Sequence, residues 1–369
     1  SMEEELRRVL TSGTNPTRNV EANLADIRAQ LAAATQGARD LVDLARQYSL
    51  PVVRKQMAAI QDASETKVRM ALSKLVPGRY QRTDYLETIE GSSIPVAVTI
   101  EISEDAAIAG QPAAVIDFAG TSGAAPGNLN ANPAIVHAAV LYVMRLLVAE
   151  EIPLNEGALR AVEIRIPPGL LNPRPASPIE NSPAVAAGNV ETSQRIVDVL
   201  LGALELAAAS QGTMNNLLLG NRQFGYYETI AGGSGATAEG RGADAVQVHM
   251  TNTRATDPEI LERNLPVRLW ETSNRRNSGG AGRHRGGNGL VRHIEFLEPL
   301  ELSLICQRCG PWPPFGLAGG EPGACGQHEL RRASGEIERL RGIDQCEVQA
   351  GDALIMRTPG GGGWGTPAD

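Results

Sequence analysis

Three features are scarce in this 369-residue sequence, and each scarcity excludes a class of protein. Four cysteines are too few to build the disulfide framework of a small secreted protein. No apolar run is long enough to span a membrane, and the start of the chain lacks the charged-then-apolar pattern of a signal peptide. Basic residues number 34 against 42 acidic ones, and the net charge of -8 argues against nucleic acid or an anionic membrane surface as the main partner. These absences predict a cytoplasmic protein.

The rest of the composition is that of a folded chain. With 42% hydrophobic and 21% charged residues, it is long enough for two or three cores. The pattern along the chain predicts a mixed α+β fold, with an N-terminal helical hairpin, central sheets covered by buried helices and a β-rich C-terminal region. We expect a hairpin at residues 1–80, a mixed α/β core carrying the site at 81–275, and a glycine-rich β region at 276–369. Ser1-Met2 resembles a cloning remnant, so we expect a fragment of a longer protein.

The cysteines raise the question of a metal site. Cys306 and Cys309 have the two-residue spacing of a zinc knuckle or a redox pair. A structural zinc site needs a second pair, whereas Cys325 and Cys346 stand alone with His328 near the first of them. The sequence therefore favours free thiols on adjacent strands and turns, and we predict no metal site in this chain.

Two long helices are predicted in the first eighty residues. Apolar residues step by four, three and four positions through Val20, Leu24, Ile27 and Leu31, and the stripe continues until Ser49 and Pro51 break it. A second helix is expected over about residues 52–75. The exposed faces of both helices carry mixed charges and no convergent polar cluster. This pattern indicates a packing or dimerisation element rather than a catalytic one.

From residue 85 the pattern changes from helical to alternating, which predicts strands. The expected strands cover residues 95–102, 113–118, 161–166, 224–230, 245–254, 290–297 and 300–306. A further apolar helix should open at Pro133 and run to about residue 149. The loop before it displays Asn130, which we keep as a ligand candidate because turn chemistry already accounts for its neighbours Asn128 and Asn132.

The rest of the chain is organised around residues 183–204. Small residues lead into a helix that we predict to begin at Asn189 as its N-cap, and apolar residues at spacings of three and four should bury most of it. Its first two turns gather polar side chains at the positive end of the helix dipole, where an anionic or strongly polar ligand is stabilised. The alternative is a capped helix in which Glu191 and Arg195 pair locally.

Glycine-rich segments dominate the remainder. Residues 232–242 lack the lysine and the strand-loop-helix order of a phosphate-binding loop. The glycines there either let backbone amides approach some other ligand closely or form a flexible hairpin. Residues 278–289 look like an RGG-type nucleic-acid segment, but alternating strands follow at once and no aromatics are interleaved. The tail at 358–365 either docks through Trp364 or frays.

Several motifs in order resemble the hydantoinase B family, the B-type half of ATP-dependent 5-oxoprolinases and N-methylhydantoinases. The motifs are Asn-Val-Glu-Thr-Ser-Gln-Arg (189–195), Gly-Thr-Met-Asn-Asn (212–216), Tyr-Tyr-Glu-Thr-Ile (226–230), His-Met-Thr-Asn-Thr-Arg (249–254), Ser-Gly-Gly-Ala-Gly-Arg (278–283), Gly-Leu-Ala-Gly-Gly-Glu-Pro-Gly (316–323) and Pro-Gly-Gly-Gly-Gly-Trp-Gly (359–365). The resemblance implies ATP-dependent opening of a cyclic amide such as 5-oxoproline or a hydantoin. An acetone or acetophenone carboxylase-type subunit and a non-catalytic scaffold stay open as alternatives.

The resemblance also implies cofactors and partners outside this chain. ATP and Mg²⁺ are expected on an A-type subunit or domain, and the whole enzyme is expected to be an oligomer. Family members carry a region ahead of the helical hairpin whose His and Asp residues bind a divalent metal in the carboxylase relatives, and this region is missing from the sequence. The fragment alone is therefore expected to be inactive.

Site roles follow from the chemistry that the resemblance implies. Amide donors would stabilise the negative charge that develops on the carbonyl oxygen, and an arginine could bind a substrate carboxylate in a bidentate pair. A titratable group is needed to activate water or to protonate the leaving nitrogen. The predicted catalytic residues are Glu191, Glu228 and His249. The predicted substrate-binding residues are Asn130, Asn189, Thr192, Arg195, Asn215, Asn252 and Arg254.

Each titratable candidate has a structural alternative. Glu191 would otherwise be a capping carboxylate, Glu228 a cross-strand partner of an arginine, and His249 a satisfied strand histidine. The predicted site requires these polar groups to meet in one place.

Overall fold

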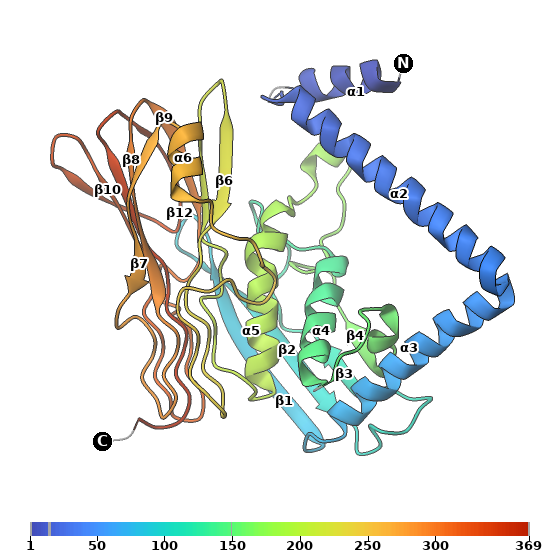
Figure 1. Ribbon diagram of the computed structural model, residues 1–369. Helices are drawn as coiled ribbons and strands as arrows, with labels where there is room; N and C mark the ends of the chain where they lie inside the picture. The colour runs from blue at the N-terminus through green and yellow to red at the C-terminus, as the bar shows by residue number, and fades with distance from the viewer. Residues whose placement is uncertain (1, 14–15, 149, 368–369) are drawn as a thin grey trace.

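The computed structural model describes residues 2–13, 16–148 and 150–367, and it has the predicted mixed α+β architecture (Figure 1). The helices are α1 Met2–Thr11, α2 Val20–Tyr48, α3 Leu50–Leu72, α4 Pro133–Leu147, α5 Ser193–Ala203 and α6 Pro258–Asn264, with 3-10 turns η1 Glu156–Ala161 and η2 Ile179–Asn181 and a π-helical turn η3 Gly188–Thr192. The strands are β1 Gly78–Glu87, β2 Ser93–Ile102, β3 Ala114–Asp117, β4 Val162–Arg165, β5 Asn216–Gly220, β6 Gly225–Thr229, β7 Val267–Arg275, β8 Gly289–Phe296, β9 Leu300–Ile305, β10 Gln327–Arg331, β11 Ile337–Leu340, β12 Ile343–Val348 and β13 Ala353–Arg357. None of the described helices is long and apolar enough to cross a bilayer.

The first layer is a four-stranded sheet in the order β1-β2-β3-β4, antiparallel except for the parallel pair β3 and β4. Alternate residues of β2, among them Val96, Val98 and Ile100, are buried, as the period of a strand requires. Helix α5 packs against β1 and β2 and lies beside α4 (Figure 1). Sheet and helices share one core, which fully buries α5.

The C-terminal half is β-rich, as predicted. Its two antiparallel sheets have the strand orders β11-β10-β13-β8-β7 and β12-β9-β5-β6. Inward side chains from both sheets, such as Phe296, Leu302 and Met356, form a single second core. Strands face each other across this core as in a sandwich.

Glycine-rich segments pack backbone to backbone beside these layers. This glycine bundle comprises residues 232–243, 278–288, 314–324 and 359–365, which exchange backbone hydrogen bonds instead of forming regular strands. Gly233 N donates to Pro359 O at 3.0 Å, and Gly361 N donates to Gly287 O at 2.9 Å. The tail therefore does not fray: Thr358 is fully buried and Trp364 is 8% exposed. The 232–242 loop is likewise fixed by packing rather than flexible.

Replacing Gly361 by alanine is expected to lower the free energy of unfolding by about 1–3 kcal/mol. A Cβ at this position would stand 1.9 Å from the carbonyl oxygen of Ser234, so the packed backbones must separate. The matched control is Gly123→Ala, where a Cβ meets nothing within 4 Å and stability should change by less than about 0.5 kcal/mol. Urea unfolding measures both, and equal stabilities of the two variants would contradict the proposed close packing.

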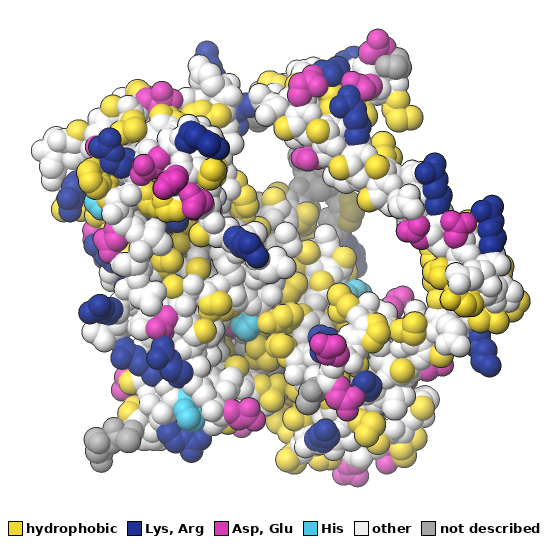
Figure 2. Space-filling view, in the orientation of Figure 1, with side chains coloured by type: hydrophobic (Ala, Val, Ile, Leu, Met, Phe, Trp, Pro, Cys, Tyr) yellow, Lys and Arg dark blue, Asp and Glu magenta, His cyan; other side chains and the backbone are white. Residues whose placement is uncertain are grey.

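At the other end of the chain, α2 and α3 form an arm that leaves the body and returns to it (Figure 1). Their bounds confirm the two predicted helices, and Asn19 caps α2 by accepting from Ala22 N at 3.0 Å. Ser49, with a φ of 72°, makes the sharp joint between them. Figure 2 shows open space between this arm and the body.

Candidate functional site

Four charged side chains meet beneath α5. Arg308, in the loop after β9, is bidentate to Asp84 of β1 at 3.2 and 2.8 Å. The same guanidinium reaches Asp198 of α5 at 3.0 Å. Arg195, one turn before Asp198, lies 3.1 Å from Asp84 and donates to Tyr85 O at 2.7 Å. Asp84, Arg195, Asp198 and Arg308 are all at most 6% exposed, and we call them the charged cluster.

The charged cluster is electrically balanced, since it pairs two guanidinium groups with two carboxylates. Burial alone would raise the pKa of Asp84, but Arg195 and Arg308 outweigh it and lower that pKa below the ordinary value. Burial also opposes ionisation of Asp198, whose pKa is nevertheless lowered by His249 and Arg308. Both carboxylates are therefore ionised at neutral pH.

The charged cluster reaches toward the surface through His249. Its Nε2 lies 3.5 Å from Asp198 Oδ1, and its Nδ1 lies 3.3 Å from the hydroxyl of Tyr142 on α4. The His249 side chain is 12% exposed, whereas that of Asp198 is fully buried. Burial raises the pKa of Tyr142, so its hydroxyl keeps its proton. Asp198, His249 and Tyr142, here called the His249 triplet, thus lie in contact with one another between the buried helix α5 and the partly exposed residues around it.

The backbone around His249 is not the strand predicted for residues 245–254. Ala245 and His249 have φ values of 46° and 52°, a left-handed conformation that no strand contains. Gln194 of α5 holds this loop by donating to Val248 O at 3.1 Å. That prediction was wrong because alternating polarity in this segment arises from an irregular loop packed on α5.

The predicted start of the central helix at Asn189 was also wrong. Helical geometry is already present at residues 186–187, and Asn189 lies inside η3 with its side chain exposed. Gly188 packs so closely that a Cβ there would stand 2.2 Å from Asn130 O, which explains the small residues before the helix. Apart from Asn189, the polar residues of the first turns, from Glu191 to Arg195, are buried, so they do not form an open anion site.

Asn130 and Thr192, both predicted to bind substrate, hold the chain together at this point. The Asn130 amide accepts from Ala125 N at 2.8 Å and donates to Ala184 O at 3.0 Å. The Thr192 hydroxyl donates to Leu129 O. Their polar groups are thus engaged by backbone.

Glu191 is a buried carboxyl rather than a cap. Its Oε1 accepts from Met214 N at 3.1 Å and from the amide of Asn216 at 2.5 Å. Burial raises the pKa of Glu191 to about 8, so the group is largely protonated at neutral pH. The local pair with Arg195 does not form, because Arg195 takes Asp84 as its partner.

Asn215 is likewise buried, and its amide is engaged. With a φ of 47°, it turns the chain into β5, and its amide donates to Gln211 Oε1 at 2.7 Å and to Ile230 O at 3.0 Å. Asparagine tolerates this left-handed backbone better than most residues. Its amide therefore serves the turn.

A second polar site lies beside the loop of residues 245–254, which also carries His249. Glu228 of β6 pairs with Arg292 of β8 at 2.8 Å and accepts from Thr256 N at 2.8 Å. Beside this pair is a pocket of about 430 Å³ lined by Gln247, Asn252 and Arg292, among others. Glu228 thus has an arginine partner, as its structural alternative predicted. Asn252 is exposed at the pocket, and Arg254 is exposed two residues further along.

The predicted residues therefore separate into groups. Arg195 and His249 meet through the charged cluster, and Glu228 and Asn252 lie at the pocket beside Arg292. Asn130, Glu191, Thr192 and Asn215 hold the chain together, whereas Asn189 and Arg254 are exposed. Sequence patterns did not indicate Asp84, Asp198, Arg308, Tyr142 and Arg292. Asp198 carried a usable signal, because an acidic residue three positions after Arg195 in an apolar helix needs a buried partner.

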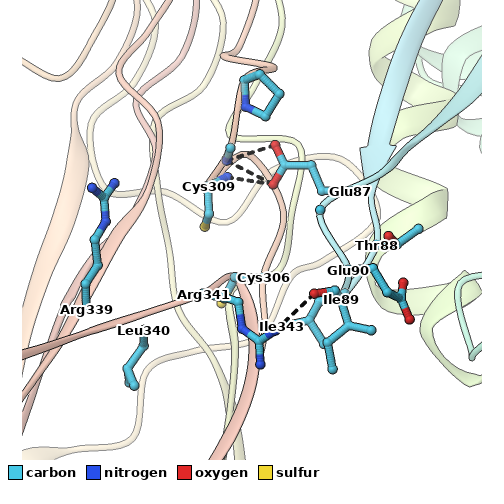
Figure 3. Close-up of a pocket in the computed structure, with 14 residues that line it drawn as sticks. Glu87, Thr88, Ile89, Glu90, Cys306, Cys309, Arg339, Leu340, Arg341 and Ile343 are labelled. Carbon is cyan, nitrogen blue, oxygen red and sulfur yellow. Dashed lines mark hydrogen bonds between the residues drawn. The ribbon is translucent and has the colours of Figure 1, made fainter.

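Cys306 and Cys309 line another pocket, of about 440 Å³ (Figure 3). Glu87 accepts from the backbone of Cys309 at 3.1 Å and of Gly310 at 3.0 Å. Cys309 Sγ is 3.4 Å from His328 Nε2, but burial raises the pKa of the thiol and lowers that of His328 to about 4. Both groups are thus neutral, which does not fit an activated nucleophile. Within residues 2–13, 16–148 and 150–367, no three His, Cys, Asp or Glu side chains converge as metal ligands.

Known proteins resemble this chain along its length. The family model for hydantoinase B/oxoprolinase matches residues 1–367. The chain is 43% identical to 5-oxoprolinase 1 of Arabidopsis thaliana over 365 residues, which is 95% of this chain and 28% of that protein. It is 27% identical to the B-type subunit of a putative D-/L-hydantoinase from Pseudomonas sp. (strain NS671), covering 93% of this chain and 60% of the relative.

A solved structure has the same fold. The ATP-dependent caprolactamase from Pseudomonas jessenii superposes with a TM-score of 0.82 at 23% identity, covering 99% of this chain and 64% of that one. This chain thus spans under a third of the plant protein and about three fifths of the bacterial ones. The full-length family match and the identity to the plant 5-oxoprolinase together place this chain in the hydantoinase B/oxoprolinase family.

Proposed function

We propose that this chain is the B-type part of an ATP-dependent hydrolase that opens five-membered cyclic amides such as 5-oxoproline or a hydantoin. The observation that carries the proposal is the 43% identity to a 5-oxoprolinase across 95% of the chain. The likeness to a relative named as one subunit of a hydantoinase supports the need for an A-type partner.

The chemistry asks for proton transfer near a reacting ring. A lactam is a resonance-stabilised amide, so water attacks its carbonyl only after activation, and the leaving nitrogen must gain a proton. In our proposal the His249 triplet carries this proton. Tyr142 or His249 donates it toward the nitrogen, and the ionised Asp198 stabilises the imidazolium when His249 holds it.

Other predicted residues take supporting roles in this proposal. Arg195 is a positioning residue, because it holds Asp84 and is fully buried. Asn252 and Arg254 are the exposed candidates for contact with a substrate carboxylate or ring oxygen. The amides of Asn130 and Asn215 donate to other groups of the chain, so they do not act on the ring without rearrangement.

ATP and Mg²⁺ are assigned to the A-type partner. The glycine-rich loops of this chain do not fit a phosphate cradle, because the amides of residues such as Gly233 and Gly361 donate to neighbouring carbonyls. Among the described residues, no group of three or more His, Cys, Asp or Glu side chains could hold a divalent metal. No step of the proposed reaction passes through either group in this chain.

The test is to purify the full-length protein with its A-type partner and to measure ATP-dependent turnover. We expect ring-opened product from 5-oxoproline or a hydantoin, and none without ATP. Acetone and acetophenone with bicarbonate serve as comparison substrates for the carboxylase alternative. Carboxylation of a ketone with no opening of either ring would contradict the proposed function.

A further inference from the structure

The pocket beside Arg292 contains buried polar atoms without a partner in the protein. Arg292 is 2% exposed, and within the part of the chain that the structure describes its Nε has no hydrogen-bond acceptor. Among the same residues nothing donates to the buried Oε1 of Gln247, whose Nε2 donates to Thr229 O at 3.1 Å. Arg292 and Gln247 both line the pocket of about 430 Å³. Because a buried polar atom left unbonded is destabilising, a donor and an acceptor that line one pocket indicate a ligand.

The charges around this pocket favour a neutral ligand. The guanidinium of Arg292 lies 2.8 Å from the carboxylate of Glu228, so its positive charge is already balanced. Thr256 N holds Glu228 in place by donating to the other carboxylate oxygen at 2.8 Å. An anion here would add a second negative charge beside Glu228 and would face the acceptor of Gln247. A neutral group that carries both an acceptor and a donor satisfies Arg292 and Gln247 without this repulsion.

A five-membered cyclic amide has this combination on one edge. Its ring holds the amide in the cis form, so the carbonyl oxygen and the N–H project to the same side. The carbonyl oxygen accepts and the N–H donates, as Arg292 and Gln247 require. The carbon atoms of the ring match the apolar side chains of Ile230, Val246 and Leu290, which line the same pocket.

We infer that this pocket binds the substrate ring by its amide edge, with Arg292 donating to the ring carbonyl and Gln247 accepting from the ring N–H. The inference rests on the proposed function and deepens it, because it names the side chains that select the ring. Asn252, exposed at the same pocket, is then available to a substituent of the ring such as the carboxylate of 5-oxoproline. Gln247 and His249 are two residues apart, so one loop carries both the ring contact and a proton donor of the proposed reaction.

The test is the affinity of the full-length protein, assembled with its A-type partner, for 5-oxoproline without ATP, measured by isothermal titration calorimetry. The comparison ligand is the lactone in which a ring oxygen replaces the N–H of 5-oxoproline. Wild type should bind the lactone about tenfold more weakly or worse, because Gln247 loses its donor and faces a second acceptor. Gln247→Met keeps the length of the side chain but removes the acceptor, so it should bind the two ligands about equally.

Arg292→Lys tests the other half of the contact. It keeps a positive charge beside Glu228 but lacks the Nε donor, and it should weaken the binding of both ligands about tenfold or more. The matched control is Gln345→Met, at an exposed position of β12 outside the pocket, which should bind as wild type does. The lactone comparison in wild type decides the inference even where a variant does not fold.

Equal affinity of wild type for 5-oxoproline and for the lactone would overturn the inference, and so would an affinity for 5-oxoproline that neither substitution changes. Tighter binding of glutarate than of 5-oxoproline would also overturn it, because that result identifies an anion site at Arg292. The proposed function survives these outcomes if ATP-dependent ring opening still occurs. Ring binding that requires Gln247 and Arg292, in an enzyme that opens no ring, would support the inference and contradict the proposed function.

Discussion

Replacing Arg308 by leucine is expected to lower the free energy of unfolding by about 3–5 kcal/mol. Arg308 is fully buried and bonds both Asp84 and Asp198, so its loss leaves two buried carboxylates with Arg195 as the remaining guanidinium of the charged cluster. An uncompensated buried charge costs far more than the ion pair itself contributes. Urea unfolding followed by circular dichroism measures the change.

The matched control is Arg46→Leu, whose side chain is 77% exposed and pairs with Asp43. It should change stability by less than about 0.5 kcal/mol. Arg308→Lys should fall between the two, because a single ammonium replaces the charge but not the bidentate geometry. A loss below about 1 kcal/mol for Arg308→Leu would contradict the role of the charged cluster in holding β1, α5 and the loop after β9 together.

Replacing His249 by asparagine is expected to slow ring opening in the assembled enzyme by about 100-fold or more. The substitution removes the titratable ring while keeping a residue that tolerates the left-handed backbone, with its φ of 52°. Rates of product formation are measured under saturating ATP with 5-oxoproline or a hydantoin. Tyr142→Phe should reduce the same rate, because it removes the hydroxyl 3.3 Å from the imidazole.

His137→Asn provides the control, since it makes the same change at an exposed position of α4. It should retain the wild-type rate, and all variants should keep the wild-type unfolding midpoint and their association with the A-type partner. Wild-type turnover by His249→Asn would favour the alternative of a non-catalytic scaffold.

Local patterns predicted most of the elements. The stripe through Val20, Leu24 and Leu31 indicated α2, the proline at 133 indicated the start of α4, and alternation predicted β2, β8 and β9 nearly to the residue. These predictions succeed because apolar residues spaced by three and four mark the buried face of a helix, and apolar residues spaced by two mark the buried face of a strand. The predicted end of α4 at 149 lies outside the described residues, and the division into three parts stays a prediction.

The site was less predictable, because its geometry depends on contacts between distant segments. Arg308 and Asp84 are 224 residues apart, and no local pattern joins them. Asn189 was mistaken for an N-cap because its polarity was visible, whereas the close approach of Gly188 to Asn130 O was not. The composition of the glycine-rich segments predicted loops. It did not predict their close packing, in which Gly233 and Gly361 leave no room for a Cβ.

The central claim is that this chain supplies the proton in ring opening while its partner uses ATP. The most direct measurement is the ratio of ring-opened product to ADP in the His249→Asn enzyme, compared with wild type under the same conditions. We predict that ADP formation continues and that the ratio falls at least tenfold, because activation is separated from ring opening. An unchanged ratio, with product and ADP falling together or not at all, would contradict the claim.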